Sequence, residues 1–76
     1  MPEFNYEIVR KVATLSESNG YTTEVNLIKY GGGRTKLDIR KWNRNEDRML
    51  KGITLTKQEG LDLLAALKDL DFEEVE

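Results

Sequence analysis

Residues 34–55 read RTKLDIRKWNRNEDRMLKGITL, and the rest of the predicted sheet is organised around them. Within residues 35–43, the apolar side chains Leu37 and Ile39 share one parity. The opposite parity carries Lys36, Asp38, Arg40 and Trp42. Because successive side chains of a strand point to opposite faces of a sheet, this alternation predicts a β-strand with one apolar and one cationic face. The single tryptophan is expected to lie open on the cationic face; packing at a dimer seam or under a terminus is the alternative.

A second strand is predicted for residues 48–55, after a polar connection at residues 43–47. Lys51 has the parity of the apolar residues of this strand, and Gly52 follows it. A glycine inside a strand marks a bulge or a close approach of backbones. A bulge at this position would turn Lys51 away from the core.

The N-terminal part of the chain predicts a hairpin. Residues 4–16 are rich in β-forming side chains, but the apolar ones fall on both parities, as in a bent strand or one covered on both faces. Residues 16–20 end in Asn-Gly, a strong turn signal, and residues 21–30 predict the next strand. The three glycines at 31–33 lack the Gly-Lys-Ser/Thr ending of a phosphate loop and are interpreted as a flexible hairpin tip.

The chain ends in one predicted helix. Thr56 and Glu59 have the spacing of a capping box, so the helix is expected to start after Thr56 and to run to about residue 70. Its apolar side chains span roughly 160°, whereas packing on one sheet face needs only about 100°. A second copy of the helix is the simplest cover and would form a two-fold interface, with a monomer that exposes leucines as the alternative. The expected dimer-interface residues are Leu61, Leu63, Leu64, Leu67 and Leu70.

The length of 76 residues allows a single domain over residues 1–76. Residues 71–76 form an acidic tail, in which Phe72 either belongs to a frayed end or packs on a dimer. A core this small usually needs disulfides, a metal or a partner subunit, and the sequence contains neither Cys nor His. We therefore expect a homodimer. The expected fold class is α+β, with a four-stranded curved antiparallel sheet followed by one C-terminal helix (β-β-β-β-α).

Charge is distributed unevenly along the chain, although the net charge is only −2. Residues 29–57 hold nine cations and three anions, a local charge of +6, and the rest of the chain carries −8. Phosphate binding depends on where charge sits rather than on its sum. Cations around an exposed aromatic side chain are what single-stranded nucleic acid requires, so this region is a candidate nucleic-acid-binding surface. The alternative interpretation is that these charged side chains only keep exposed strand faces in contact with water and bind no partner.

No catalytic residue, metal ligand, cofactor or small-molecule substrate is predicted. The sequence has no His or Cys, and its hydroxyl groups have no evident base partner. Asp38 is expected to orient Arg40 or a neighbour rather than to act as a general base. Residues 1–10 lack the apolar run of a signal peptide, and no stretch approaches the roughly 20 apolar residues of a membrane span. We therefore expect a cytoplasmic, nucleoid-associated protein without a membrane partner.

The segments KLDIRKW (residues 36–42) and LKGITL (residues 50–55), followed by a capped helix, resemble the transcriptional positive cofactor four family, most closely its small bacterial, YdbC-like branch. This resemblance implies a homodimer of β-β-β-β-α subunits with paired helices at the seam. It also implies that single-stranded DNA crosses the curved sheets through backbone contacts and base stacking, largely without sequence preference. Lys41-Trp42-Asn43 departs from relatives that have two adjacent aromatics here, and the Ser-rich arm of the eukaryotic coactivators is absent.

Carried over residue by residue, the resemblance predicts a nucleic-acid-binding set, to which the charge pattern adds two cations. The resemblance assigns Tyr30, Arg34, Arg40, Trp42 and Lys51, and the charge pattern adds Lys36 and Arg48. The expected function is a non-enzymatic single-stranded-DNA-binding homodimer that acts in transcription regulation or in DNA replication and repair, with RNA left open as a ligand. The alternative is a protein-interaction module whose basic sheet docks an acidic partner.

Overall fold

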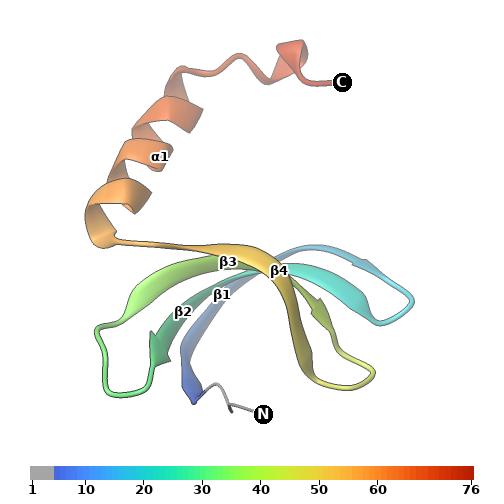
Figure 1. Cartoon of the computed structure of the whole chain (residues 1–76). Coiled ribbons are helices and arrows are strands. Elements are labelled where there is room, and N and C mark those ends of the chain that lie inside the picture. The colour runs from blue at the N-terminus through green and yellow to red at the C-terminus, as the bar shows by residue number, and fades with distance from the viewer. Residues whose placement is uncertain (1–4) are drawn as a thin grey trace.

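The computed structural model describes residues 5–76 and contains one curved antiparallel sheet followed by a helix (Figure 1). The strands are paired in the order β1-β2-β3-β4. The elements are β1 (Tyr6–Ser18), β2 (Tyr21–Tyr30), β3 (Lys36–Asn43), β4 (Arg48–Leu55), α1 (Lys57–Asp69) and the short 3₁₀ helix η1 (Phe72–Glu74). The predicted β-β-β-β-α architecture is therefore confirmed.

Local turn chemistry sets the strand boundaries. The bounds of β2 and β4 are those predicted, and β3 starts one residue later than predicted. β1 continues to Ser18, and the predicted strand position Phe4 lies outside the described residues. Asn19 and Gly20 make the connection to β2 with φ of 52° and 83°. Positive φ at both central residues matches the right-handed twist of a hairpin, which explains the Asn-Gly pair.

β1 is bent by three irregularities in its pairing with β2. The register shifts between Ile8 and Arg10, between Lys11 and Ala13, and between Thr14 and Ser16. Each shift leaves one extra residue without a Cα partner on β2, and these residues are Val9, Val12 and Leu15. Bulges bend a strand and strengthen its twist, which explains why the apolar residues of β1 do not keep one parity.

The sheet has two unlike faces, and α1 lies on the convex side (Figure 1). Cross-strand partners point to the same face. We call the side away from α1 the concave face; it carries Tyr6, Ile8, Lys11, Glu24, Asn26, Ile28, Tyr30, Lys36, Asp38, Arg40, Trp42 and Thr54. The opposite, helix-side face carries Val25, Leu27, Leu37, Ile39 and Ile53. The most deeply buried side chains, Ile28, Trp42, Asn26 and Asp38, all belong to the concave face.

The helix begins as predicted but leaves its apolar stripe uncovered. The Glu59 backbone N–H donates to Thr56 Oγ1 at 3.2 Å, and the Thr56 N–H donates to Glu59 Oε1 at 2.9 Å, so the capping box is formed. No residue of α1 is buried. The predicted interface residues Leu61, Leu64, Leu67 and Leu70 are exposed, and Leu63 is half-buried. None of the helices in residues 5–76 has the length and apolar character needed to cross a membrane.

Candidate nucleic-acid interface

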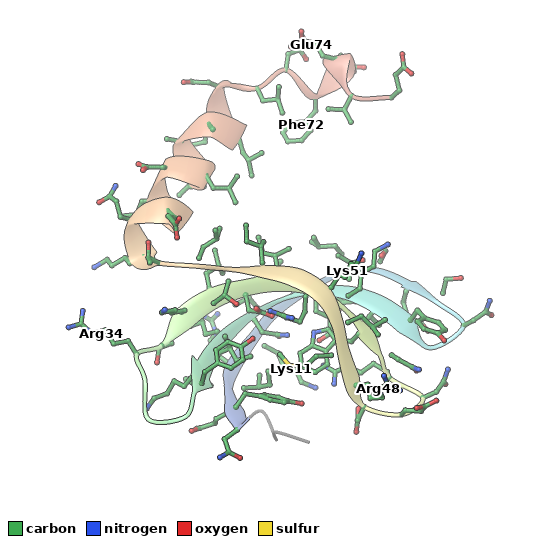
Figure 2. All side chains as sticks on the ribbon, viewed as in Figure 1. Lys11, Arg34, Arg48, Lys51, Phe72 and Glu74 are labelled. Carbon is green, nitrogen blue, oxygen red and sulfur yellow. The ribbon has the colours of Figure 1, made fainter. Side chains whose placement is uncertain are left out.

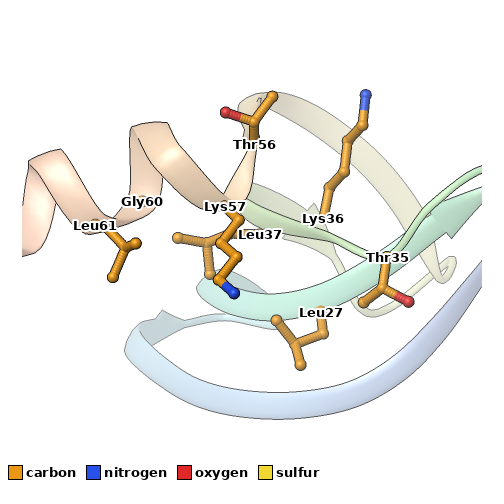
Figure 3. A pocket seen from close by; sticks show the side chains of 8 residues that line it. All are labelled: Leu27, Thr35, Lys36, Leu37, Thr56, Lys57, Gly60 and Leu61. Carbon is orange, nitrogen blue, oxygen red and sulfur yellow. The ribbon is translucent and has the colours of Figure 1, made fainter.

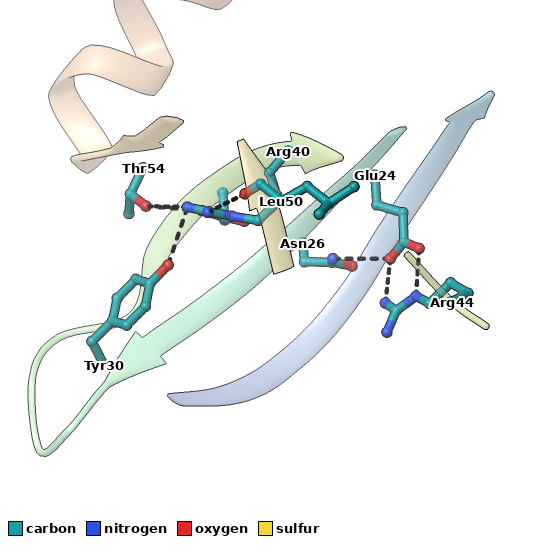
Figure 4. Close-up of polar contacts among 8 residues, drawn as sticks. Glu24, Asn26, Tyr30, Arg40, Arg44, Leu50 and Thr54 are labelled. Atoms are coloured by element: carbon teal, nitrogen blue, oxygen red, sulfur yellow. Dashed lines mark hydrogen bonds and ion pairs between the residues drawn. The ribbon is translucent and has the colours of Figure 1, made fainter. Parts of the chain in front are cut away.

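Arg40 lies at the centre of a polar network on the concave face (Figure 4). Its Nε and Nη2 donate to Asp38 Oδ2 and Oδ1 at 2.6 and 2.7 Å. Nη1 donates to the Leu50 carbonyl oxygen at 3.1 Å, and Nη2 also donates to the Tyr30 hydroxyl at 3.1 Å. The Thr54 hydroxyl donates to Asp38 Oδ1 at 2.8 Å. The expectation that Asp38 orients Arg40 is confirmed by this two-point contact, which fixes the plane of the guanidinium.

The Asp38 carboxylate compensates the charge of Arg40. The hydrogen bond to Asp38 is the main reason why the pKa of Arg40 is raised above its ordinary value, with burial acting in the opposite direction. Only 13% of the Arg40 side chain is exposed. Arg40 is therefore a permanently charged group that mainly holds the concave face together, and its Nη1 retains one N–H beyond the bond to Leu50.

Gly52 makes this position of Arg40 possible. Gly52 and Arg40 are Cα partners, and the register between β3 and β4 shifts between Arg40 and Trp42. A Cβ atom on Gly52 would lie 1.9 Å from Arg40 Cβ and 2.6 Å from the Ile39 carbonyl oxygen. The predicted bulge and close backbone approach at Gly52 are thus confirmed.

A groove of about 560 Å³ opens beside Arg40 and is lined by Tyr30, Arg40, Met49 and Leu50. The Tyr30 ring is half-buried, and its hydroxyl is fixed by Arg40. On the neighbouring strand, Tyr6 is the Cα partner of Tyr30 and is 37% exposed. Two tyrosine side chains therefore lie next to each other on the concave face, where a planar base can stack on them.

The prediction that Trp42 lies open on the cationic face is wrong. Trp42 belongs to the concave face, as the alternation predicted, but it is 0% exposed. The Tyr6 ring packs against it at a centroid distance of 5.9 Å, and the Arg44 guanidinium carbon lies 4.1 Å from the centre of the Trp42 ring. The sheet curves strongly, and Arg44 covers the Trp42 ring through a cation–π contact. Trp42 is therefore part of the core of the concave face and not an exposed surface for base stacking.

A second ion pair joins Arg44 to Glu24 (Figure 4) and fixes the guanidinium that packs on the Trp42 ring. Arg44 Nη2 and Nε donate to Glu24 Oε1 and Oε2 at 2.6 and 2.8 Å. The Thr22 hydroxyl and the Asn26 side-chain amide also donate to the Glu24 carboxylate, at 2.5 and 3.3 Å. These hydrogen bonds, above all the one from Arg44, lower the pKa of Glu24 to about 2 although burial opposes the shift. The carboxylate is therefore fully ionised in the folded protein at neutral pH.

The lowered pKa of Glu24 predicts a loss of stability in acid. The ordinary pKa is 4.5 and the folded-state value is about 2, so ionised Glu24 stabilises the fold above pH 4.5 and this contribution disappears as the pH falls toward 2. Glu24→Gln is expected to be less stable than the parent at pH 7 and to lose less stability between pH 4.5 and pH 2. Urea unfolding across this pH range measures the difference. If the free energies of unfolding of the two proteins changed with pH in the same way, the lowered pKa of Glu24 would be contradicted.

The other predicted cations are separated by the sheet. Lys36 is exposed on the concave face, and Arg34 is exposed in the hairpin before it. Arg48 is exposed at the start of β4 with its Nη1 3.5 Å from Glu46 Oε1. Lys51 lies on the helix side of the sheet, opposite to Lys11 (Figure 2). The predicted set therefore does not form one site, because Lys51 and Arg40 lie on opposite faces.

Sequence reasoning missed two residues of the concave face. Lys11 is exposed, pairs with Asn26 across β1 and β2, and has no ion-pair partner within residues 5–76. Tyr6 is the second missed residue. Tyr6 keeps the parity of Ile8, whereas the extra residue Val9 shifts the parity of Lys11, so a simple alternation could not place Lys11 on this face. Within residues 5–76, no three side chains of the metal-binding types are grouped.

The concave face thus offers two tyrosine rings, a groove and exposed cations, an arrangement suited to a flexible anionic chain with planar groups. No family model matches the sequence. A protein of Treponema pallidum (strain Nichols), described as an uncharacterized protein, is 42% identical over 69 residues, which are 90% of this chain and 76% of that protein.

Proposed function

This chain belongs to the same family as the Treponema pallidum protein, and we propose that it is a non-enzymatic, largely sequence-independent single-stranded-DNA-binding homodimer similar to the transcriptional positive cofactor four family. The concave face is the proposed binding surface. The observation that carries the proposal is that Tyr30 lines the groove with Arg40, Met49 and Leu50, and that its Cα partner on β1 is a second tyrosine, Tyr6. Bases would stack on the tyrosine rings while phosphates contact the cations around them.

The proposed phosphate ligands are the exposed cations at the edges of the concave face. Lys11 and Lys36 project from β1 and β3, and Arg34 stands in the adjoining hairpin. Arg34 and Lys36 also border a cavity of about 370 Å³ together with Lys57, so three cations meet at one end of the sheet. Lys11, Arg34 and Lys36 have no ion-pair partner within residues 5–76, so their charge is available to phosphates. Arg40 contributes through its remaining Nη1 N–H, and Trp42 supports the surface from below.

The proposed homodimer rests on the uncovered leucines of α1. Leu61, Leu64 and Leu67 are 41–50% exposed in the single chain. A contiguous apolar stripe of this kind marks an interaction surface. Pairing with a second copy of α1 would cover it with the same residues from both sides.

Tyr30→Ala is expected to weaken binding of oligo-dT by about 1–3 kcal/mol, the usual contribution of one base–aromatic stack. Fluorescence anisotropy of a labelled oligonucleotide measures the loss. Tyr21→Ala is the matched control, because Tyr21 is 50% exposed on the same strand but has the opposite parity. Equal affinities for the parent and Tyr30→Ala would remove Tyr30 from the site.

The same titration separates the proposal from its alternative. A protein-interaction module that docks an acidic partner would bind acidic peptide and show no salt-dependent affinity for oligonucleotides. Single-stranded DNA, duplex DNA and RNA are compared in parallel, since only contacts to the 2′-hydroxyl distinguish RNA from DNA. We place the activity in the cytoplasm, on single strands exposed during transcription, replication or repair.

A further inference from the structure

We infer that Phe72, in the C-terminal tail of one copy, inserts into a pocket at the start of α1 in a second copy. We call this contact the clasp. The inference rests on the helix-paired homodimer proposed above and names the contact that locks it. Three observations carry it: an apolar pocket, a shaped apolar plug, and complementary charge around both.

The pocket lies where α1 leaves the sheet (Figure 3). It has a volume of about 310 Å³, and its apolar wall is formed by Leu27, Leu37 and Leu61. Gly60 lies against the same wall; a Cβ atom there would come within 3.3 Å of Leu37 Cδ2. An apolar cavity of about 150 Å³ already accommodates a benzene ring, so this pocket has room for a phenyl side chain.

The plug is the short helix η1. Its turn is closed by the Asp71 carboxylate, which accepts from the Glu73 N–H at 3.0 Å, and by the Val75 N–H, which donates to the Phe72 carbonyl oxygen at 3.0 Å. Phe72 is nevertheless 60% exposed and points from the tail toward the sheet side of the molecule (Figure 2). A tail with a defined turn and an exposed phenyl ring is already ordered for docking, which lowers the entropy cost of binding.

Charge favours the same pairing. The tail from residue 69 onward is acidic, with Asp69, Asp71, Glu73, Glu74 and Glu76. The pocket is bordered by Lys57, whose side chain points toward Leu27, and by Lys36, which extends in the opposite direction (Figure 3). Lys57 is therefore the cation that meets the tail, while the Lys36 ammonium stays free for the proposed phosphate contacts.

The helix keeps the plug away from the pocket of its own chain. α1 has 13 residues and is about 20 Å long, with the pocket at its start and Phe72 beyond its end. Two antiparallel copies of α1, related by a two-fold axis, place the end of each helix beside the start of the other. Phe72 of one copy then lies near the pocket of the other, and the contact occurs twice per dimer.

Crosslinking tests the clasp directly, because the parent chain contains no cysteine. Phe72→Cys and Thr35→Cys, the latter at an exposed residue that lines the same pocket, are prepared as separate single variants, mixed, and treated with a short bis-maleimide. The expected result is a covalent dimer from the mixture only, since each variant alone places its two thiols at opposite ends of the helix pair. A protein that sediments as a dimer but gives no crosslink would overturn the clasp and leave the homodimer intact. A protein that sediments as a monomer would overturn both.

Phe72→Ala gives a second readout on the full chain. Removal of two buried phenyl rings per dimer is expected to raise the dimer dissociation constant at least about 100-fold. Leu15→Ala is the matched control, because Leu15 is 62% exposed near the opposite end of the sheet from the pocket. An unchanged dissociation constant for Phe72→Ala would overturn the clasp.

Discussion

Trp42→Ala is expected to destabilise the folded protein by about 3–5 kcal/mol, the usual cost of truncating a buried aromatic side chain. The indole is 0% exposed, and both the Tyr6 ring and the Arg44 guanidinium pack against it. Natural domains have only about 5–15 kcal/mol of total stability, so this single change removes a large part of it. Urea unfolding followed by far-UV circular dichroism measures the loss. Protein concentration is held constant, since the stability of the proposed dimer would depend on it.

Trp42→Phe is the matched control for the size of the ring. The Trp42 Nε1–H is buried without a hydrogen-bond partner in the described part of the chain, so phenylalanine removes an unsatisfied donor and costs less than alanine. If Trp42→Ala kept the unfolding midpoint of the parent and lost only its affinity for oligonucleotides, the indole would be a stacking surface after all.

Asp38→Ala is expected to cost about 3–5 kcal/mol, because it leaves a largely buried guanidinium without its counter-charge. Asp38 is 0% exposed and accepts hydrogen bonds from both Arg40 and Thr54. The substitution also raises the positive charge of the concave face by one, so any folded fraction is expected to bind single-stranded DNA more tightly than the parent does. Urea unfolding and oligonucleotide titration on the same sample measure the two effects.

Asp47→Ala is the matched control for the loss of a carboxylate. Asp47 also pairs with an arginine, Arg44 at 3.3 Å, but its side chain is 82% exposed. Exposed pairs of this kind contribute about 0–1 kcal/mol. Equal and small effects of the two substitutions would show that burial does not strengthen the Asp38–Arg40 pair.

The architecture could be predicted from the sequence because its signals are local. The alternation of residues 35–43, the Asn19-Gly20 turn and the capping box of Thr56 and Glu59 each act over a few residues and were confirmed. The path of β1 could only be described as irregular. Its three extra residues become bulges through pairing with β2, and the signs of that pairing are spread over more than 20 residues.

The site was less predictable because strand parity gives the face of a residue but not its exposure. Parity placed Trp42 correctly on the face of Arg40, yet sheet curvature and Tyr6 bury it. The partner that keeps it buried, Arg44, is held by Glu24, which lies 20 residues away in the sequence. Long-range ion pairs of this kind have no local signal. The face on which Lys51 lies was likewise not predictable, because it depends on how the bulge beside Gly52 orients this side chain.

The salt dependence of oligo-dT affinity tests the proposed concave-face site most directly, measured for the parent, Lys11→Ala and Lys51→Ala. Each phosphate neutralised on a single strand contributes about 0.7 to the slope of log K against log salt. Because Lys11 and Lys51 are exposed on opposite sides of the sheet, Lys11→Ala is expected to reduce the slope by about 0.7 and Lys51→Ala to leave it unchanged. A slope that falls for Lys51→Ala and not for Lys11→Ala, or a parent protein with no salt-dependent binding, would contradict the account.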